Sequence, residues 1–319
     1  MSVIATAFNR REFLRHALLS LINQDADPDS FEIVVSKNFY DQRVDELCSD
    51  RGIRDVTTDS SSSGERVYDA LHASHGEFVL FLDDDDIFYR TKVSRVMQVI
   101  SMDGIAFYRN AIFPVTADGH VAAGYQPHMD APLRIDRPGR SDAHRMRRLN
   151  CMFNSSSMGI LRDILDDHAG DLRRIALAVD TFYFAMALST GRPVYCDSSV
   201  ESIYRIMPRS TSRDLRSFSS FVAFEKSFLH RYVPDLERIN DMVRGTPAEA
   251  FMESELSIYE MLLYVFEDDE CESRPPISRR LRFLRMRFPC SLMYSRTLRN
   301  LAMECEFRRD MGRIYGDVR

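Results

Sequence analysis

The sequence has 319 residues, of which 45% are hydrophobic and 28% are charged, and its formal net charge is −6. These values are typical of a globular protein with one large or two ordinary domains, and they give no case for a nucleic-acid partner. The six cysteines form no C-x-x-C pair, which argues against a zinc site and indicates a reducing compartment. No stretch reaches the roughly 20 apolar residues of a membrane span. We therefore expect a cytoplasmic protein.

Strand and helix patterns alternate over the first part of the chain. The predicted strands are 2–7, 31–35, 53–57 and 77–82. The predicted helices between them are 11–23, 41–50 and 65–74. Such alternation with short connections is typical of an α/β protein whose mainly parallel central sheet carries helices on both faces.

The pattern changes along the rest of the chain. The next predicted elements are helices 91–102, 161–168 and 175–190, strands 104–113, 193–196 and 201–205, a loop or hairpin over 116–139, and a basic helix or lid over 141–149. The last predicted elements are the long helices 215–232, 236–243, 247–267, 278–288 and 292–313. We therefore predict an α/β domain over 1–212 and a helical C-terminal region over 213–319.

The stretch from Glu77 to Tyr89 reads E-F-V-L-F-L-D-D-D-D-I-F-Y. Its apolar run is typical of a strand buried on both faces of a sheet, and it leads straight into four aspartates, Asp83 to Asp86. Adjacent carboxylates repel one another, and a hard cation such as Mg²⁺ or Mn²⁺ bridging to substrate phosphates would offset that repulsion. The alternative is a solvated acidic turn that caps the following helix.

Four separated segments resemble the family 2 glycosyltransferases, whose catalytic domain has the GT-A fold. The segments are S-V-I-A-T-A-F-N-R-R-E-F-L-R-H-A-L-L-S-L-I-N-Q, S-S-G-E-R-V-Y-D-A-L-H-A-S-H-G-E-F-V-L-F-L-D-D-D-D, V-D-T-F-Y-F-A-M-A-L-S-T-G-R-P-V-Y and Y-R-I-M-P-R-S-T-S. They stand in the family's order and spacing and cover residues 2 to about 212. The resemblance implies transfer of a sugar from a nucleoside-diphosphate sugar to an acceptor hydroxyl, with inversion at the anomeric carbon.

The resemblance also implies where the nucleotide lies. The end of the first strand would hold the base through Thr6, Phe8 and Arg10, although Phe8 can instead be a packing residue. The family usually has an Asp after the second strand to bind the base, whereas this sequence has Ser36-Lys37-Asn38. Asn38 can still bond a base edge. The base therefore stays open, with a UDP-sugar favoured and a GDP- or dTDP-sugar as alternatives.

The family's Asp-x-Asp motif corresponds to Asp83 and Asp85. The resemblance implies that Asp85 ligates Mn²⁺ or Mg²⁺ on the diphosphate, and that Asp83 reaches the ribose or, through water, the metal. Asp84 and Asp86 are expected to orient the loop, and Asp84 is grouped with the residues that bind the nucleotide sugar.

Two further segments supply candidate donor contacts. Asp69 stands where the family often has Asn, and Arg66 either reaches a phosphate or pairs with Asp69 at i+3, the pair being slightly favoured. In the fourth segment Met207 replaces a His that can hold the metal or the diphosphate, and a thioether is a poor ligand for a hard cation. The remaining candidates for phosphate contact are Arg205, Arg209, Ser210 and Ser212.

The catalytic base of the family is an Asp at the start of a helix that a Gly ends about eleven residues later. Asp180 and Gly191 fit that spacing, and Val179 replaces the Glu that commonly precedes the base. The resemblance therefore implies that Asp180 takes the proton from the acceptor hydroxyl. An Asp in the first turn of a helix can also serve only as a cap.

Two other functions stay as alternatives. The departures at Asn38, Val179 and Met207 leave open a protein of the same fold that binds nucleotide sugars without turnover. A phosphohydrolase with Asp83 as nucleophile fits poorly, because the strand order differs and lysines are scarce. Acceptors of the family are often glycans or lipid-linked. The basic stretch 279–288 can accordingly lie on the inner face of a membrane as a peripheral contact, or it is a solvated helix face.

Overall fold

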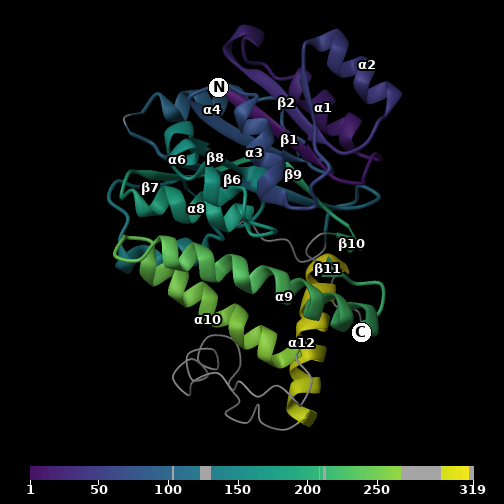
Figure 1. Cartoon of the computed structure of the whole chain (residues 1–319), viewed down its shortest axis with the longest axis vertical. Coiled ribbons are helices and arrows are strands. Elements are labelled where there is room, and N and C mark those ends of the chain that lie inside the picture. Colours follow the sequence, from purple (N-terminus) through teal and green to yellow (C-terminus); the bar gives the residue numbers. More distant parts are fainter. Residues whose placement is uncertain (103, 123–130, 208, 211–212, 267–295, 316–319) are drawn as a thin grey trace.

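The computed structural model of the chain describes residues 1–102, 104–122, 131–207, 209–210, 213–266 and 296–315 (Figure 1). The strands are β1 (Ser2–Ala7), β2 (Glu32–Lys37), β3 (Arg54–Thr57), β4 (Phe78–Asp83), β5 (Ile87–Phe88), β6 (Phe107–Thr116), β7 (Leu133–Ile135), β8 (Met158–Leu161), β9 (Val194–Ile206), β10 (Arg209–Ser210) and β11 (Arg213–Asp214). The α-helices are α1 (Leu14–Ile22), α2 (Gln42–Arg51), α3 (Ser63–His72), α4 (Lys92–Ile100), α5 (Ala143–Arg148), α6 (Arg162–Asp167), α7 (Ala169–Leu172), α8 (Val179–Ser189), α9 (Phe218–Met242), α10 (Glu249–Phe266) and α12 (Arg296–Tyr315).

One large sheet has the strand order β3-β2-β1-β4-β8-β6-β9-β5, and β7 also pairs with β9. The first four of these strands are mutually parallel, as are β6 and β9. Strand β8 runs antiparallel to both β4 and β6, so it joins the two parallel parts. The predicted α/β class with a mainly parallel central sheet is confirmed.

Apolar runs in the central strands reflect burial on both faces of the sheet. In β1, Val3 and Ala5 face a core that contains α1, α2 and α4, whereas Ile4 faces a second core with α3, α6 and α8. In β4, Leu80 and Phe81 divide between the same two cores. Successive side chains of a strand point to opposite faces, so a strand covered by helices on both sides is continuously apolar.

The C-terminal helices pack on the outside of α8 (Figure 1). Val233 and Leu236 of α9 and Phe251 of α10 share a buried cluster with Phe184 of α8. The rings of Phe184 and Phe251 meet edge to face with centroids 5.0 Å apart. The second part of the chain therefore extends the core under the helix that begins with Val179 and Asp180.

Two predicted breaks, one in a helix and one in a strand, are wrong. The predicted helices 215–232 and 236–243 form one helix, α9, which continues through Pro234. Proline removes one helical hydrogen bond, but Val233 and Leu236 on either side are buried, and this packing outweighs the loss. The predicted strands 193–196 and 201–205 form one strand, β9, which stays paired with β6 through register shifts.

Some of the predictions concern residues that the structure does not describe. The basic stretch 279–288, predicted as a membrane contact or a solvated face, lies outside the described residues, as does Ser212. Among the helices that are described, none combines the length and apolar character needed to cross a membrane.

Candidate active site

The parallel strands β1 and β4 end side by side, and the acidic loop starts at this edge. Thr6 of β1 lies opposite Asp83, the last residue of β4. Asp83 is half-buried, and the next three aspartates are only 3%, 8% and 1% exposed. A solvated acidic turn is therefore excluded, because the carboxylates are enclosed by protein at the carboxyl ends of the strands, where ligands of open α/β sheets bind.

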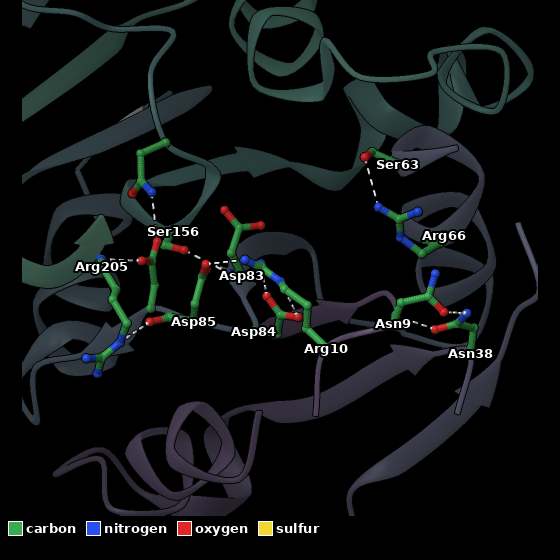
Figure 2. Close-up of polar contacts among 12 residues, drawn as sticks. Asn9, Arg10, Asn38, Ser63, Arg66, Asp83, Asp84, Asp85, Ser156 and Arg205 are labelled. Atoms are coloured by element: carbon green, nitrogen blue, oxygen red, sulfur yellow. Dashed lines mark hydrogen bonds and ion pairs between the residues drawn. The ribbon is translucent and has the colours of Figure 1, made fainter. Parts of the chain in front are cut away.

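Arg10 joins the end of β1 to the acidic loop. Asn9 has φ +57°, a left-handed conformation that Asn tolerates better than most residues, and it turns the chain after the strand. The Arg10 guanidinium then donates to both carboxylate oxygens of Asp84, and its Nη1 donates to Asp85 Oδ2 at 2.5 Å (Figure 2). Burial lowers the pKa of Arg10, but the two carboxylates raise it further, so the net shift is upward.

The Asn154–Ser156 segment, which precedes β8, contacts three of the candidate aspartates. The Asn154 side chain donates from Nδ2 to Asp86 Oδ2 at 2.7 Å, and its backbone N–H donates to Asp180 Oδ2 at 3.1 Å. Ser155 Oγ donates to Asp180 Oδ1 at 3.3 Å. Ser156 Oγ accepts the backbone N–H of Asp83 at 2.9 Å. One short segment thus holds the acidic loop next to the start of α8.

Negative charge is concentrated in this site. Burial, followed by repulsion from Asp86 and Asp85, raises the pKa of Asp83 well above its ordinary value. Burial also raises the pKa of Asp84 to about 7, although the Arg10 cation opposes the shift. The pKa of Asp86 rises to about 7 through burial and through repulsion by Asp85. A bound cation would therefore find carboxylates whose charges are only partly compensated.

Asp180 lies in the first turn of α8, as predicted. Burial raises the pKa of its carboxyl, while bonds from its own backbone, Asn154 and Ser155 oppose that shift. Three residues on, Tyr183 is fully buried, its ring stacks on Phe81 of β4 with centroids 3.9 Å apart, and its hydroxyl has no partner among the described residues. The start of α8 is therefore fixed directly against the strand that carries the acidic loop.

A buried lysine donates a hydrogen bond to the Asn154–Ser156 segment. Lys92, at the start of α4, is fully buried, and its Nζ donates to the Ser156 carbonyl oxygen at 2.5 Å and to Ser202 Oγ at 2.9 Å. The Nζ lies 3.6 Å from the centroid of the Phe88 ring. Burial lowers the pKa of Lys92 well below its ordinary value, although Glu201 and Asp86 oppose the shift.

Arg66 lies at the side of the site, against the end of β1. Its guanidinium lies over the Phe8 ring, 4.9 Å from the centroid, and donates to the Ser60 carbonyl at 3.2 Å and Ser63 Oγ at 2.9 Å. The favoured pairing with Asp69 is wrong, because the buried side chain turns toward the beginning of α3 and forms no ion pair with Asp69 in the described structure. Burial lowers the pKa of Arg66, while Asp83 and Asp84 oppose that shift.

Asn38, one of the predicted base-binding residues, lies with Asn9 at the end of the site away from Arg205 (Figure 2). Arg10, also predicted to bind the base, instead directs its guanidinium to Asp84 and Asp85. Asn38 follows β2, and its side-chain amide exchanges two hydrogen bonds with Asn9, each 2.8 Å long. Thr6 and Phe8 lie on the adjacent end of β1, and both are partly exposed. The carboxyl ends of β1 and β2 therefore present amide and aromatic groups at one edge.

Arg205 of β9 closes the acidic loop from the opposite side. Its backbone N–H donates to Asp86 Oδ1 at 2.8 Å, and its Nε donates to the Asp85 carbonyl oxygen at 3.1 Å. The guanidinium lies 4.5 Å from the centroid of the Phe13 ring. Met207, where the family often has His, is the next residue but one and is partly exposed.

Comparisons with known proteins give the family of this chain. The family model described as "Glycosyl transferase family 2" matches residues 2–169, which is more than half of the chain. The chain belongs to this family. It is accordingly a glycosyltransferase. Among curated proteins, none matches the sequence.

Solved structures of similar fold include TarS and a mannosyltransferase. TarS of S. aureus, residues 1–349 in complex with UDP-GlcNAc, aligns with a TM-score of 0.58 and 16% identity over 89% of this chain and 78% of that chain. The mannosyltransferase PcManGT from Pyrobaculum calidifontis, in complex with GDP-Man and Mn²⁺, aligns with a TM-score of 0.56 and 13% identity over 96% of this chain and 84% of that chain. At such identities these likenesses establish the GT-A fold.

The glycosyltransferase offers few protein ligands for a metal. Within the described ranges, no group of three or more His, Cys, Asp or Glu side chains is arranged to hold an ion. Burial and the acidic neighbours, however, raise the pKa of the Asp83 carboxyl well above its ordinary value, and Asp85 contributes a second carboxylate. Mg²⁺ and similar ions in nucleotide sites are commonly held by one or two carboxylates together with the substrate phosphates. The donor set therefore fits a cation that arrives with a diphosphate.

Sequence reasoning missed the residues that hold this site together. The polar run N-S-S-S at 154–157 directly before an apolar strand was the only available signal. The structure shows that all four residues are buried, and buried polar groups are generally hydrogen-bonded. Lys92 follows the acidic loop closely in a chain that has only three lysines. Its burial depends on β9 and on the Asn154–Ser156 segment, which are distant in sequence.

Proposed function

We propose that this glycosyltransferase transfers a sugar from a nucleoside-diphosphate sugar to an acceptor hydroxyl, with inversion and with help from a divalent cation. The observation that carries the proposal is the bridge made by Asn154, which bonds Asp86 of the acidic loop and Asp180 of α8. Asp180 is thereby held close to the acidic loop, as a base acting on an acceptor beside the donor's diphosphate must be.

Asp180 acts as the general base in this proposal. Its carboxylate takes the acceptor hydroxyl proton while the acceptor oxygen attacks the anomeric carbon from the face opposite the leaving diphosphate. A single displacement of this kind needs no protein nucleophile. The two bonds from the Asn154–Ser156 segment fix the orientation of the Asp180 carboxylate before the substrate arrives.

The donor would bind along the edge formed by β1, β2 and β4. Asp83 and Asp85 would hold Mn²⁺ or Mg²⁺, which neutralises charge on the departing nucleoside diphosphate. Asp84 and the guanidinium groups of Arg10, Arg66 and Arg205 would surround the diphosphate. The base would lie at Thr6, Phe8 and the Asn9–Asn38 amide pair, and Asp69 stays a candidate for a donor contact.

The identity of the donor follows less directly from the site. TarS was solved with UDP-GlcNAc and PcManGT with GDP-Man and Mn²⁺, which supports a nucleotide-sugar donor and a divalent cation. We favour a UDP-sugar, with GDP- and dTDP-sugars as alternatives. The acceptor would be a glycan or a lipid-linked sugar.

The experiment measures release of nucleoside diphosphate from UDP-, GDP- and dTDP-sugars with Mn²⁺, beside calorimetry of donor binding. Asp85→Ala should abolish Mn²⁺-dependent nucleoside diphosphate binding. Asp180→Asn should leave donor binding nearly unchanged and lower the transfer rate by about 10²- to 10⁴-fold, the usual contribution of a positioned base. Asp167→Asn, at an exposed aspartate, is the matched control. Donor binding with no turnover by the unmodified protein would instead identify a nucleotide-sugar binder.

A further inference from the structure

Arg10 occupies the carboxylate that the proposed cation requires. Its Nη1 is bonded to Asp85 Oδ2 at 2.5 Å, and its Nη2 and Nε are both bonded to Asp84, the latter at 3.2 Å. Charge-assisted bonds from a planar guanidinium are among the strongest that a protein makes to carboxylates. A divalent cation at Asp85 therefore meets a protein cation that is already bound there.

The two contacts of Arg10 differ in how permanent they are. The Asp84 side chain is only 4% exposed and accepts bonds from Arg10 through both of its oxygens. Breaking this contact would leave a buried carboxylate without its partner. The Asp85 side chain is 11% exposed and engages Arg10 through a single oxygen. The Arg10 side chain is itself 36% exposed, which leaves it room to rotate about its bond to Asp84.

We propose that Arg10 is an internal counter-cation of the acidic loop that excludes metal from the donor-free enzyme and moves from Asp85 to the donor's diphosphate when metal and donor bind together. This inference rests on the proposed function, because it takes Asp85 as a metal ligand. Arg10 remains anchored on Asp84 throughout. The exchange conserves charge pairing, since the cation replaces Arg10 at Asp85 and the diphosphate replaces Asp85 as the partner of Arg10.

This arrangement predicts opposite effects of one substitution on two ligands. Arg10→Ala removes the competitor of the metal, so Mn²⁺ alone should bind the donor-free protein about tenfold more tightly or better, from the loss of a charge-assisted contact. The same change removes a diphosphate contact, so UDP in the presence of Mn²⁺ should bind about tenfold more weakly. A residue that only stabilises the fold would not shift the two affinities in opposite directions.

The test measures Mn²⁺ binding to the full chain by electron paramagnetic resonance of the free ion, with and without UDP. The variants are Arg10→Ala, Arg10→Gln, Arg10→Ala with Asp85→Asn, and Arg11→Ala as the control. Arg11 is exposed and lies 5.3 Å from the centroid of the Phe39 ring. Arg10→Gln keeps much of the side-chain volume without the charge, and it gives a second reading if the alanine variant folds poorly.

We expect Mn²⁺ to bind the unmodified protein well only with UDP, to bind both Arg10 variants without it, and to lose that gain when Asp85→Asn is added. Equal Mn²⁺ affinity in the unmodified and Arg10 variants would overturn the inference, while Asp85-dependent binding of UDP and Mn²⁺ would leave the proposed function standing. A gain of affinity that survives Asp85→Asn would also overturn it. Absence of any Asp85-dependent binding of UDP, GDP and dTDP with Mn²⁺, each measured in the same way, would refute the proposed function as well.

Discussion

The backbone N–H of Asn154 donates to Asp180 Oδ2 at 3.1 Å, so the proposed base is fixed by a residue 26 positions earlier in the chain. Asn154 has φ +70°, and its side-chain Oδ1 is buried without a partner among the described residues. A non-glycine residue in this conformation with an unsatisfied polar atom is costly. Strained residues of this kind are concentrated at active sites, so we expect Asn154 to affect the transfer reaction.

Asn154→Ala and Asn154→Gly should separate the role of the side chain from that of the backbone. Both remove the bond to Asp86, and we expect both to slow transfer by about tenfold or more. Glycine adopts positive φ without strain, whereas alanine does not, so only Asn154→Ala should also lower the melting temperature clearly. The control is Asn150→Gly, because Asn150 also has positive φ but is exposed. Full activity in Asn154→Gly would show that the side chain is dispensable.

The second prediction concerns pH. Burial raises the pKa of Asp180, and a general base works only when ionised, so the transfer rate should fall as the pH drops through a pKa above the ordinary Asp value. Ser155→Ala removes a bond that favours the ionised form and should move this acidic limb to higher pH. Ser157→Ala, whose hydroxyl bonds only backbone carbonyls in the described structure, should not. Profiles of kcat against pH at saturating donor provide the measurement, and an unmoved limb in Ser155→Ala would assign it to another group.

The third prediction concerns Lys92, whose pKa burial lowers well below the ordinary value. The unfolded chain therefore binds a proton at this lysine more readily than the folded one, and the stability of the unmodified protein should rise with pH between the two pKa values. Lys92→Met removes this dependence, so the variant should gain stability relative to the unmodified protein as the pH is lowered.

Transfer by Lys92→Met should nevertheless fall by a few-fold, since the Ser156 carbonyl oxygen keeps only its 2.6 Å bond from Ser202. Urea unfolding at several pH values, beside the turnover assay, measures both effects. The control is Lys226→Met on α9, which replaces a partly exposed lysine away from the acidic loop. A stability difference that is constant with pH would show that Lys92 is protonated equally in the folded and unfolded states.

The sequence predicts those features of the fold and the site that residues close together in the chain determine. It does not predict those that depend on contacts between distant segments. Val3, Ile4 and Ala5 are apolar in succession, and that alone indicates a strand covered on both faces. The contact of Arg66 with Phe8 was not predictable, because it depends on the packing of α3 against β1, which lies far away in the sequence. The continuity of α9 through Pro234 likewise depends on burial against α8, which a local proline rule does not include.

Asp235 gives the last prediction, which links the C-terminal helices to the site. Its side chain is fully buried in α9 and accepts the backbone N–H groups of Ala176, Leu177 and Ala178 at 3.1, 2.7 and 3.1 Å. These are the residues directly before α8, whose N-cap, Ala178, has no side chain able to cap the helix. Asp235 thus fixes from another helix the backbone turn that leads into α8, by accepting the N–H groups of the three residues before the helix.

Asp235→Ala should lower the free energy of unfolding by about 2 to 4 kcal/mol, because three buried N–H groups lose their acceptor. Asp235→Asn keeps one acceptor oxygen and should cost less. Asp241→Ala on the same helix removes an exposed ion pair with Arg244 and should change stability by less than about 1 kcal/mol. Because Asp180 lies two residues after Ala178, Asp235→Ala should also slow transfer at temperatures where the variant is fully folded. Urea unfolding and turnover measured together decide the matter: lost stability with unchanged turnover would confine Asp235 to holding the helices together.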